Sequence, residues 1–340
     1  MDSRDWLIIT SIPRSLDIAK IAERSGLPQS TVSRRLKALL PQIKVRFTVS
    51  RRALGLKPLI LIFDKMPYKL PAYTISYRKG VYYGNEVYVV VASVPKDAIS
   101  DYISLFPYEP GFIFVGEERV FWRPDLASHY NIIDENLEVN YHKLRRIDTI
   151  WNNAQPTTID TYDLLIIFFK EKYAFTSLAH ISRQGLMNGI KSSQQLLSYH
   201  FHRHVLPIWL GNSVHLYRPL SEYPIRIHFY EVFDAENLVS KLSLIPYIHT
   251  IYYTNDSIAF SCQLSVKETY KLFKNVLVEY RAKPLHPEIY LDQSLRKYLI
   301  KYYKLWKRGW LKPSALVYKK TQVPSSQHSK HHGPKWPIDV

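Results

Sequence analysis

The segment from Leu16 to Leu40, LDIAKIAERSGLPQSTVSRRLKALL, predicts two short helices joined by a tight turn. The apolar sides of these helices consist of Ile18, Ile21 and Ala22, and of Val32, Leu36 and Leu39. Residues at such spacings share one helical face. In the turn, Gly26 tolerates a positive φ, and Pro28 suits the first turn of the next helix. This arrangement is typical of a helix-turn-helix unit.

The opposite side of the second predicted helix is polar and cationic. Its outward residues are Gln29, Ser30, Ser33, Arg34 and Lys37. Such a face suits a DNA major groove, because arginine pairs with guanine, glutamine with adenine, and hydroxyls with bases or phosphates. We therefore expect Gln29–Leu40 to be a recognition helix. The alternative is a helical hairpin inside an ordinary core with a solvated, arginine-rich face.

The charge of this region is strongly one-sided. No Asp or Glu occurs between Arg24 and Phe63, although the span is rich in Lys and Arg. Protein surfaces usually mix both signs, so a long span of one sign favours a polyanionic partner. Over 340 residues the formal net charge is +17, with 46% hydrophobic and 14% aromatic residues. We therefore expect a globular protein that binds nucleic acid or another anionic surface.

Several classes of protein are disfavoured by the sequence. No apolar run is long enough to span a bilayer and no signal-like segment follows Met1, so we expect a cytoplasmic, nucleoid-associated protein without a membrane partner. Cys262 is the single cysteine, which excludes an internal disulfide and an all-cysteine metal site. No GxGxxG, P-loop, nucleophile elbow or acid–base carboxylate pair is found, so we expect neither an enzyme nor a cofactor.

A basic strand is predicted directly after the recognition helix. From Ile43 to Ser50, in IKVRFTVS, apolar and polar residues alternate as they do in half-buried strands. A basic strand in this place is typical of a wing, whose cations would lie along a phosphate backbone. The alternative is an edge strand that its charges protect.

A sheet domain is predicted next. Its elements are strands at Lys57–Phe63, Thr74–Tyr83 and Glu86–Ser93, a helix at Lys96–Phe106 and a strand at Phe112–Trp122. Gly84-Asn85 is a tight hairpin turn. The order is βββαβ, or βαββαβ if Tyr68–Ala72 forms a short helix. Both orders suit an antiparallel sheet with helices on one face.

These features together resemble the leucine-responsive/AsnC-type (Lrp-like) transcription regulators of archaea and bacteria. The resemblance covers about the first third of the chain and rests on IAERSGLPQSTVSRRLKAL, the basic strand, Leu54-Gly55-Leu56 and the sheet pattern after it. It implies a DNA-binding helix-turn-helix and a ferredoxin-like domain. It places Gln29, Ser30, Thr31, Ser33 and Arg34 at bases, and Arg35, Lys37, Lys44, Arg46, Arg51 and Arg52 at phosphates.

The resemblance also implies that sheet domains pair, which would give a homodimer. Many members of the family sense an amino acid between sheet domains. The turn that lines that pocket in relatives is present here only as Tyr83-Gly84-Asn85-Glu86, and the first sheet domain lacks a proper first helix. We therefore expect no amino-acid effector.

The order of elements repeats after a polar segment, Asn131–Thr157, in which a helix is predicted at Leu137–Trp151. The repeated elements are helices at Tyr162–Lys170, Thr176–Arg183 and Gly189–His204, a hairpin of Leu206–Gly211 and Ser213–Tyr217 around Gly211-Asn212, a strand at Ile225–Val232, a helix at Ala235–Leu244, strands at Ile248–Tyr253 and Ile258–Gln263, a helix at Val266–Val276 and a closing strand at Glu288–Leu291. Lys172–Ser221 again contains no acid. We favour retained DNA binding by this second copy over a scaffold role, through Lys191, Ser192, Ser193, Gln194, His200 and Arg203.

The predicted fold class is α+β, a winged helix-turn-helix followed by a ferredoxin-like α/β sandwich, repeated twice in one chain. The predicted boundaries are a winged helix at 1–52, a degenerate ferredoxin-like domain at 53–126, a partly helical linker at 127–158, a second winged helix at 159–221, a second ferredoxin-like domain at 222–291, a basic helix at 292–318 and a disordered tail at 319–340. The basic tail adds nonspecific DNA affinity or is a plain solvated terminus.

A histidine cluster, His200, His202 and His204, is a candidate metal site. On a strand all three would share a face and could hold zinc, whereas on a helix His200 and His204 share a face and His202 points elsewhere. The segment is long and rich in Gln, Ser and Leu, so we expect a helix end and no bound metal. His328, His331 and His332 in the tail are a similarly weak candidate metal site.

The leading functional hypothesis is a sequence-specific DNA-binding transcription regulator. A second hypothesis is an architectural protein that coats duplex DNA without sequence preference, which the net charge and basic tail favour. A third is a metal-dependent nucleic-acid-processing enzyme that uses the histidine cluster.

Overall fold

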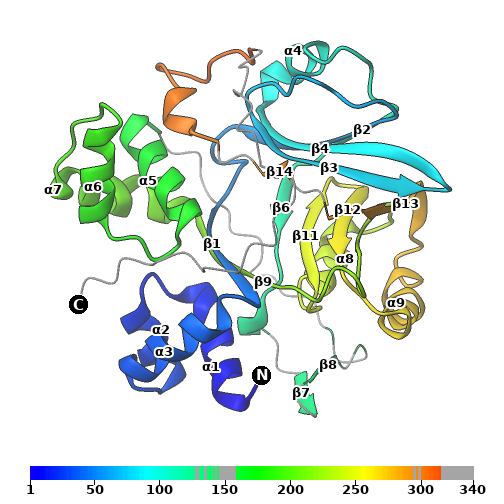
Figure 1. Cartoon of the computed structure of the whole chain (residues 1–340), viewed down its shortest axis with the longest axis horizontal. Coiled ribbons are helices and arrows are strands. Elements are labelled where there is room, and N and C mark those ends of the chain that lie inside the picture. Colours follow the sequence, from blue (N-terminus) through cyan, green and yellow to red (C-terminus); the bar gives the residue numbers. More distant parts are fainter. Residues whose placement is uncertain are drawn as a thin grey trace, which may run out of the picture.

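The protein has a mixed α+β fold with helices and antiparallel sheets (Figure 1). The computed structural model describes residues 1–126, 130–133, 136–139, 141, 144, 158–293, 296–297 and 300–314. Two helical units lie on the left of Figure 1 and the sheets on the right, with the strands β1 (Ile43–Val49) and β9 (Trp209–Leu216) between them. In the part of the chain described, no helix is long and apolar enough to cross a membrane.

The first helical unit contains the predicted helix-turn-helix. It consists of α1 (Ser3–Ser11), the 3-10 turn Ile12–Arg14, α2 (Ile18–Ser25) and α3 (Gln29–Leu39). Side chains of Asp2 and Asp17 cap the first two helices by accepting backbone N–H bonds. Gly26 ends α2 with φ 68°, the left-handed conformation that the turn requires. The two helices predicted within Leu16–Leu40 are confirmed as α2 and α3, and α1 precedes them.

The second helical unit repeats this order. It consists of α5 (Thr161–Lys172), α6 (Leu178–Met187) and α7 (Gln194–His200), which continues as a π-helical turn over Phe201–Val205 and a 3-10 turn over Leu206–Ile208. Asp160, Ser177 and Ser193 cap the three helices. The predicted helices are confirmed with shifted ends.

A two-stranded antiparallel ribbon joins the two helical units. β1 (Ile43–Val49) pairs with β9 (Trp209–Leu216), from Ile43 opposite Leu216 to Val49 opposite Trp209. The predicted hairpin around Gly211-Asn212 is wrong, because β9 is one continuous strand. In this two-stranded ribbon β1 is an edge strand, as the alternative interpretation predicts. Its partner comes from the other half of the chain, which residues adjacent in sequence cannot reveal.

Each ribbon strand completes the core of the helical unit from the other half of the chain. Val214 and Leu216 of β9 are buried with Ile9, Val32 and Leu36 of the first unit. Phe47 and Val49 of β1 are buried with α5 and α7 in the second unit, in a cluster that includes Ile166, Ile167, Phe201 and Val205. A fully buried aliphatic or aromatic side chain contributes about 1.5–3 kcal/mol. The two helical units therefore depend on each other for stability.

Gly211 and Asn212 fasten β9 to the first helical unit. Gly211 has φ 107°, and a Cβ there would lie 2.7 Å from the carbonyl oxygen of Pro13. Asn212 is buried, and its Nδ2 donates hydrogen bonds to the carbonyl oxygens of Ile12, at 3.3 Å, and Ser15, at 2.6 Å. The Gly-Asn pair thus serves a close backbone approach and not a turn.

The first sheet has the strand order β5-β2-β4-β3. Its elements are β2 (Leu56–Phe63), β3 (Thr74–Tyr82), β4 (Asn85–Pro95), a 3-10 turn at Lys96–Ala98, α4 (Ile99–Ser104) and β5 (Phe112–Val115). Tyr83 and Gly84 form the predicted hairpin turn with positive φ values of 47° and 77°. Residues 64–73 form no helix, so the order is βββαβ and the helix considered at Tyr68–Ala72 is wrong.

The second sheet has the order β13-β10-β12-β11, the same relative order as the first. Its elements are β10 (Ile225–Glu231), α8 (Ala235–Leu242), β11 (Ile248–Tyr253), β12 (Ser257–Cys262), α9 (Val266–Leu272) with a π-helical turn at Phe273–Leu277, and β13 (Lys283–Leu291). The predicted βαββαβ series is confirmed for this sheet. The helices α8 and α9 cover its outer face through Leu238, Leu242 and Leu272.

The two sheets form one continuous hydrogen-bonded system. β13 pairs with β3, and the segment predicted as one strand at Phe112–Trp122 is divided into β5, which pairs with β2, and β6 (Glu118–Val120), which pairs with β11. The inner faces pack on each other through Ile60, Val89, Phe114, Ile227, Phe229 and Ile289. A 3-10 turn at Pro124–Leu126 follows β6.

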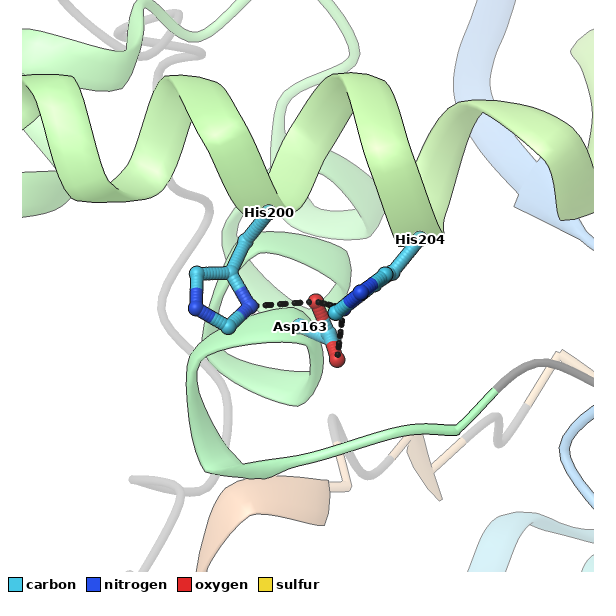
Figure 2. Close-up of side chains that lie close together, drawn as sticks. All are labelled: Asp163, His200 and His204. Carbon is cyan, nitrogen blue, oxygen red and sulfur yellow. Dashed lines mark hydrogen bonds and ion pairs between the residues drawn. The ribbon is translucent and has the colours of Figure 1, made fainter.

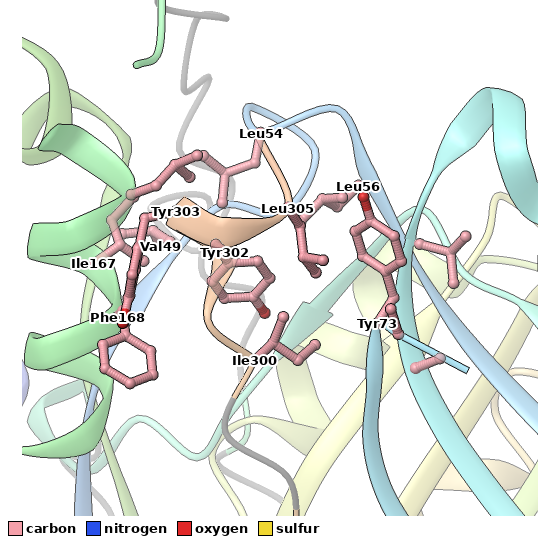
Figure 3. Close-up of a cluster of buried hydrophobic side chains, with 14 of the residues drawn as sticks. Val49, Leu54, Leu56, Tyr73, Ile167, Phe168, Ile300, Tyr302, Tyr303 and Leu305 are labelled. Carbon is pink, nitrogen blue, oxygen red and sulfur yellow. The ribbon is translucent and has the colours of Figure 1, made fainter. Parts of the chain in front are cut away.

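The C-terminal segment packs between α5 and the outer face of the first sheet, where this sheet lacks a helix (Figure 3). Ile300, Tyr302, Tyr303 and Leu305 are buried, and the indole N–H of Trp310 donates to the carbonyl oxygen of Leu54 at 2.7 Å. The basic helix predicted at 292–318 is wrong for the described residues, which form β14 (Arg296–Lys297), paired with β3, and a 3-10 turn at Tyr302–Lys304. The apolar residues of this segment pack into the core and do not form the apolar face of an amphipathic helix.

The linker contains a hairpin of β7 (Tyr130–Ile133) and β8 (Asn136–Val139). The helix predicted at Leu137–Trp151 is therefore wrong at its start, and most of its remainder lies outside the described residues. The tail predicted to be disordered, 319–340, also lies outside them.

Replacing Gly211 with alanine should destabilise the protein more than the same change at Gly84. Both positions have positive φ, which costs alanine about 1 kcal/mol or more, but only Gly211 is close to a backbone carbonyl oxygen. We expect Gly211→Ala to cost about 1–3 kcal/mol beyond Gly84→Ala in urea unfolding. Equal losses would show that β9 does not approach Pro13 as described.

Replacing Ile300 with alanine should lower the free energy of unfolding by about 2–4 kcal/mol, because it opens a cavity in the core shared with α5. Lys301→Ala is the matched control, since Lys301 is exposed and should change stability by less than about 0.5 kcal/mol. Urea midpoints at an unchanged slope provide the measurement. Equal urea midpoints for Ile300→Ala and Lys301→Ala would show that the C-terminal segment does not pack in the core.

Candidate nucleic-acid interface

The helix α3 has the division of faces that the sequence predicts. Its inward side chains, Val32, Leu36 and Leu39, are buried. Gln29, Ser30, Arg34 and Lys37 are exposed, and Thr31 and Ser33 are half-buried. The six polar residues therefore lie on the solvent side of the unit or at its margin, where a groove of DNA can reach them.

Arg35 is used inside the first helical unit. Its Nη1 lies 2.8 Å from Oδ2 of Asp2 and 2.7 Å from Oδ1 of Asp5, two carboxylates at the start of α1. These bonds raise the pKa of Arg35, with Asp5 as the main cause. Because its charge is already paired, we assign Arg35 to holding α1 against α3.

The residues expected at phosphates divide into two groups. Lys37 and Arg52 are exposed. Lys44 and Arg46 line a cavity between the ribbon and the two sheets, to which no residue of α3 contributes. They share one face of β1, since strand residues two apart point the same way. The alternation of apolar and polar residues that predicts a half-buried strand is present in β1. The polar side chains of this strand face the cavity and not a surface shared with α3.

Arg51, which the sequence analysis places at a DNA phosphate, is buried inside the protein. Its side chain is 2% exposed, and its Nη2 lies 2.5 Å from Oε1 of Glu171 on α5. Its guanidinium also lies over the ring of Tyr302, 4.9 Å from the centroid. The expected phosphate contact is wrong, because a phosphate on the surface cannot reach this group. The sequence shows its charge but not its burial.

Some of the residues expected to contact DNA from the second helical unit are exposed, and others are buried or half-buried. Lys191, Gln194 and Arg203 are exposed. Ser193 caps α7 through its side chain, and Ser192 is half-buried. His200 is buried, so its expected DNA contact is wrong. The exposed neighbours of Gln194 and Arg203 are Gln195, Tyr199 and His202.

The buried histidine belongs to a three-residue cluster with Asp163 (Figure 2). Nδ1 of His200 lies 3.0 Å from Oδ1 of Asp163, and Nδ1 of His204 lies 3.1 Å from Oδ2. Burial raises the pKa of Asp163. His202 is exposed and points elsewhere, as the helical interpretation predicts. These hydrogen bonds join α5 to α7.

Among the residues that the structure describes, the same three form a group that could hold a metal ion, since their ligand atoms lie within 4.8 Å of one another. Two imidazoles and a carboxylate are a common set of ligands for divalent ions. The hydrogen bonds within the group already satisfy the buried carboxylate, so its structure is accounted for without an ion.

Comparisons with known proteins add little to this geometry. No family model matches the sequence, and no curated protein matches it significantly. The solved structure of the leucine response regulatory protein LrpA of Mycobacterium tuberculosis is similar to part of the chain, with 18% sequence identity, 34% of this chain and 91% of that chain covered, and a TM-score of 0.25. A similarity of this size does not establish a shared fold.

Replacing Val32 with aspartate should unfold the first helical unit, because it places an unpaired carboxylate in a core where Val32 is fully buried. Ser30→Asp is the matched control on the same helix. Ser30 is exposed near the N-terminus of α3, where negative charge is favourable. Circular dichroism melting should show loss of the transition for the first variant only. Normal melting of Val32→Asp would place this face outside the core.

Proposed function

We propose that the chain is a sequence-specific DNA-binding transcription regulator and not an enzyme. In this proposal the helix α3 enters the major groove, with Gln29, Ser30 and Arg34 at base edges and Thr31 and Ser33 beside them. The observation that carries the proposal is the exposed polar face of α3 on a helix whose other face is buried. Side chains of these types at base edges supply sequence discrimination.

The charge of the exposed residues supports the proposal. The span from Arg24 to Phe63 contains no acid, and its exposed cations are Arg24, Arg34, Lys37, Lys44 and Arg52. Exposed cations without acidic neighbours attract the DNA backbone at long range. The resemblance of this segment to Lrp-like regulators points the same way.

We further propose that the chain is a tandem duplication of a winged helix followed by a ferredoxin-like domain. Each half has three helices, a ribbon strand and a sheet, and the two sheets have the same relative strand order. The halves differ in detail, because the C-terminal segment covers the first sheet where a helix covers the second.

The duplication has a consequence for the target. α3 and α7 carry different exposed residues, so the two units should recognise unequal half-sites. In a symmetric dimer the half-sites would be equal. A homodimer through the sheets is a further proposal, although β3 and β13 already join two sheets within one chain.

The proposal is tested by selecting bound sequences from random duplex oligonucleotides with the full chain. The full chain is needed because each ribbon strand completes the other half's helical unit. We expect an enriched site with two unequal parts. Uniform recovery of sequences with a steep dependence on salt would overturn the proposal in favour of the architectural alternative.

Arg34→Ala and Lys37→Ala should separate base contacts from phosphate contacts on one helix. Arg34→Ala should cost about 1–3 kcal/mol at the selected site and relax the preference at one position. Lys37→Ala should weaken binding to all sequences evenly and reduce the slope of affinity against salt. Binding titrations at several salt concentrations give both quantities. A uniform loss from Arg34→Ala would contradict its place at a base.

A further inference from the structure

A cavity lies between the ribbon and the two sheets. Its volume is about 400 Å³, and it is lined by the ribbon strands, by the inner sides of β3, β4, β10 and β11, and by Arg51, Arg119 and Glu171. Small-molecule sites commonly have volumes of about 300–1,000 Å³. Lys44 and Tyr217 line the cavity and are exposed, so they mark its opening to solvent.

The charge of this cavity is strongly unbalanced. Its lining contains five cationic side chains, Lys44, Arg46, Arg51, Arg78 and Arg119, and one carboxylate, Glu171. Nη2 of Arg51 lies 2.5 Å from Glu171, and Nη2 of Arg119 lies 3.8 Å from the same oxygen. One carboxylate of the lining therefore serves two guanidinium groups, and the lining as a whole is positively charged.

Several guanidinium donors in the cavity wall have no acceptor among the described residues. These atoms are Nε and Nη1 of Arg51, Nε of Arg78 and Nε of Arg119. Arg51 and Arg78 are only 2% and 8% exposed. A buried charged donor without a partner is costly, and nearly all buried polar groups in proteins are satisfied. The three residues come from distant segments and all line one cavity.

The electrostatics of the free cavity agree with this picture for Arg78, Arg119 and Lys44. Arg51 differs, because burial lowers its pKa but Glu171, Tyr302 and Glu118 outweigh burial and raise it. Burial lowers the pKa of Arg78. Burial and then the charge of Arg51 lower the pKa of Arg119. Partial burial and the neighbouring Arg46 lower the pKa of Lys44 to about 8. Each lowered pKa means that the surroundings disfavour the positive charge, and a bound anion would relieve these three shifts.

The rest of the wall indicates the kind of anion. Apolar side chains from the inner sheet faces, such as Ile60, Val91 and Ile227, lie beside tyrosine rings at Tyr217 and Tyr252. Planar guanidinium groups bind phosphate and carboxylate through paired N–H bonds. A phosphate group carries more negative charge than one carboxylate and so balances more of these cations.

We propose that this cavity binds a small organic phosphate, with its phosphate among Arg51, Arg78 and Arg119 and its organic part against the apolar wall. The site is separate from the exposed face of α3, and it does not depend on the DNA-binding proposal. It differs in place and chemistry from an amino-acid pocket at the turn Tyr83–Glu86. The ligand would lie against both halves of the chain, because the lining comes from both.

The test measures binding of inorganic pyrophosphate to the full chain without DNA, by calorimetry and by thermal melting. We expect saturable binding of one pyrophosphate per chain and a rise in melting temperature, because a ligand stabilises the state it binds. Sodium chloride at matched ionic strength should give neither. Citrate supplies a carboxylate comparison and should bind more weakly. Absence of pyrophosphate binding, or tighter binding of citrate, would overturn the proposal.

Variants locate the bound anion. Arg78→Gln should weaken pyrophosphate binding about tenfold to a hundredfold, because it removes a charge-assisted hydrogen bond. Lys79→Gln is the matched control, since Lys79 is the next residue on β3, pairs with Glu86 and does not line the cavity. Arg34→Ala, on the outer face of α3, should also leave binding unchanged. Binding that depends on Arg34 and not on Arg78 would assign the anion to the outer surface and overturn the proposal.

A second variant keeps the test valid if Arg78→Gln does not fold. Ser76 lines the cavity two residues from Arg78. Ser76→Asp should supply a carboxylate in place of the ligand, so it should raise the melting temperature of the free protein and weaken pyrophosphate binding. If no cations lay near position 76, the buried carboxylate would instead lower the melting temperature. A lower melting temperature with unchanged binding would contradict the proposed site.

Discussion

The pairing of β1 with β9 is the interaction on which the rest of the structure depends. It brings together strands that are more than 150 residues apart, and each strand places apolar side chains in the core of the other half's helical unit. Because of this exchange of strands, neither helical unit has a complete core without the other half of the chain. It also sets their separation, because both units are attached to a single short ribbon.

The ribbon also divides the positive charge of the chain into two populations. Because side chains alternate along a strand, its apolar residues pack on helices and its cations face the sheets. Arg34 and Lys37 on α3 remain at the surface, whereas Lys44, Arg46 and Arg51 line an internal cavity. The same basic span thus supports two proposals of different chemistry, one for DNA outside and one for a small anion inside.

The C-terminal segment is one way in which the two halves of the chain differ. The second sheet is covered by α8 and α9, whereas the first has only α4 and lacks the helix between its first two strands. Ile300, Tyr302 and Leu305 fill that place and contact α5 as well (Figure 3). The segment from Ile300 to Leu305 therefore holds the second helical unit against the first sheet.

The sequence by itself determined the local elements. The spacing of Ile21, Val32 and Leu36, the turn at Gly26 and the hairpin at Gly84 depend on neighbours within a few residues, so the helices, most strands and the outward face of α3 could be predicted. Tertiary structure decided which strands pair, what Gly211-Asn212 does, and whether a cation such as Arg51 is exposed. Those outcomes depend on contacts between residues distant in the chain, as between Arg51 and Glu171, and a local pattern of charge or hydropathy contains no record of them.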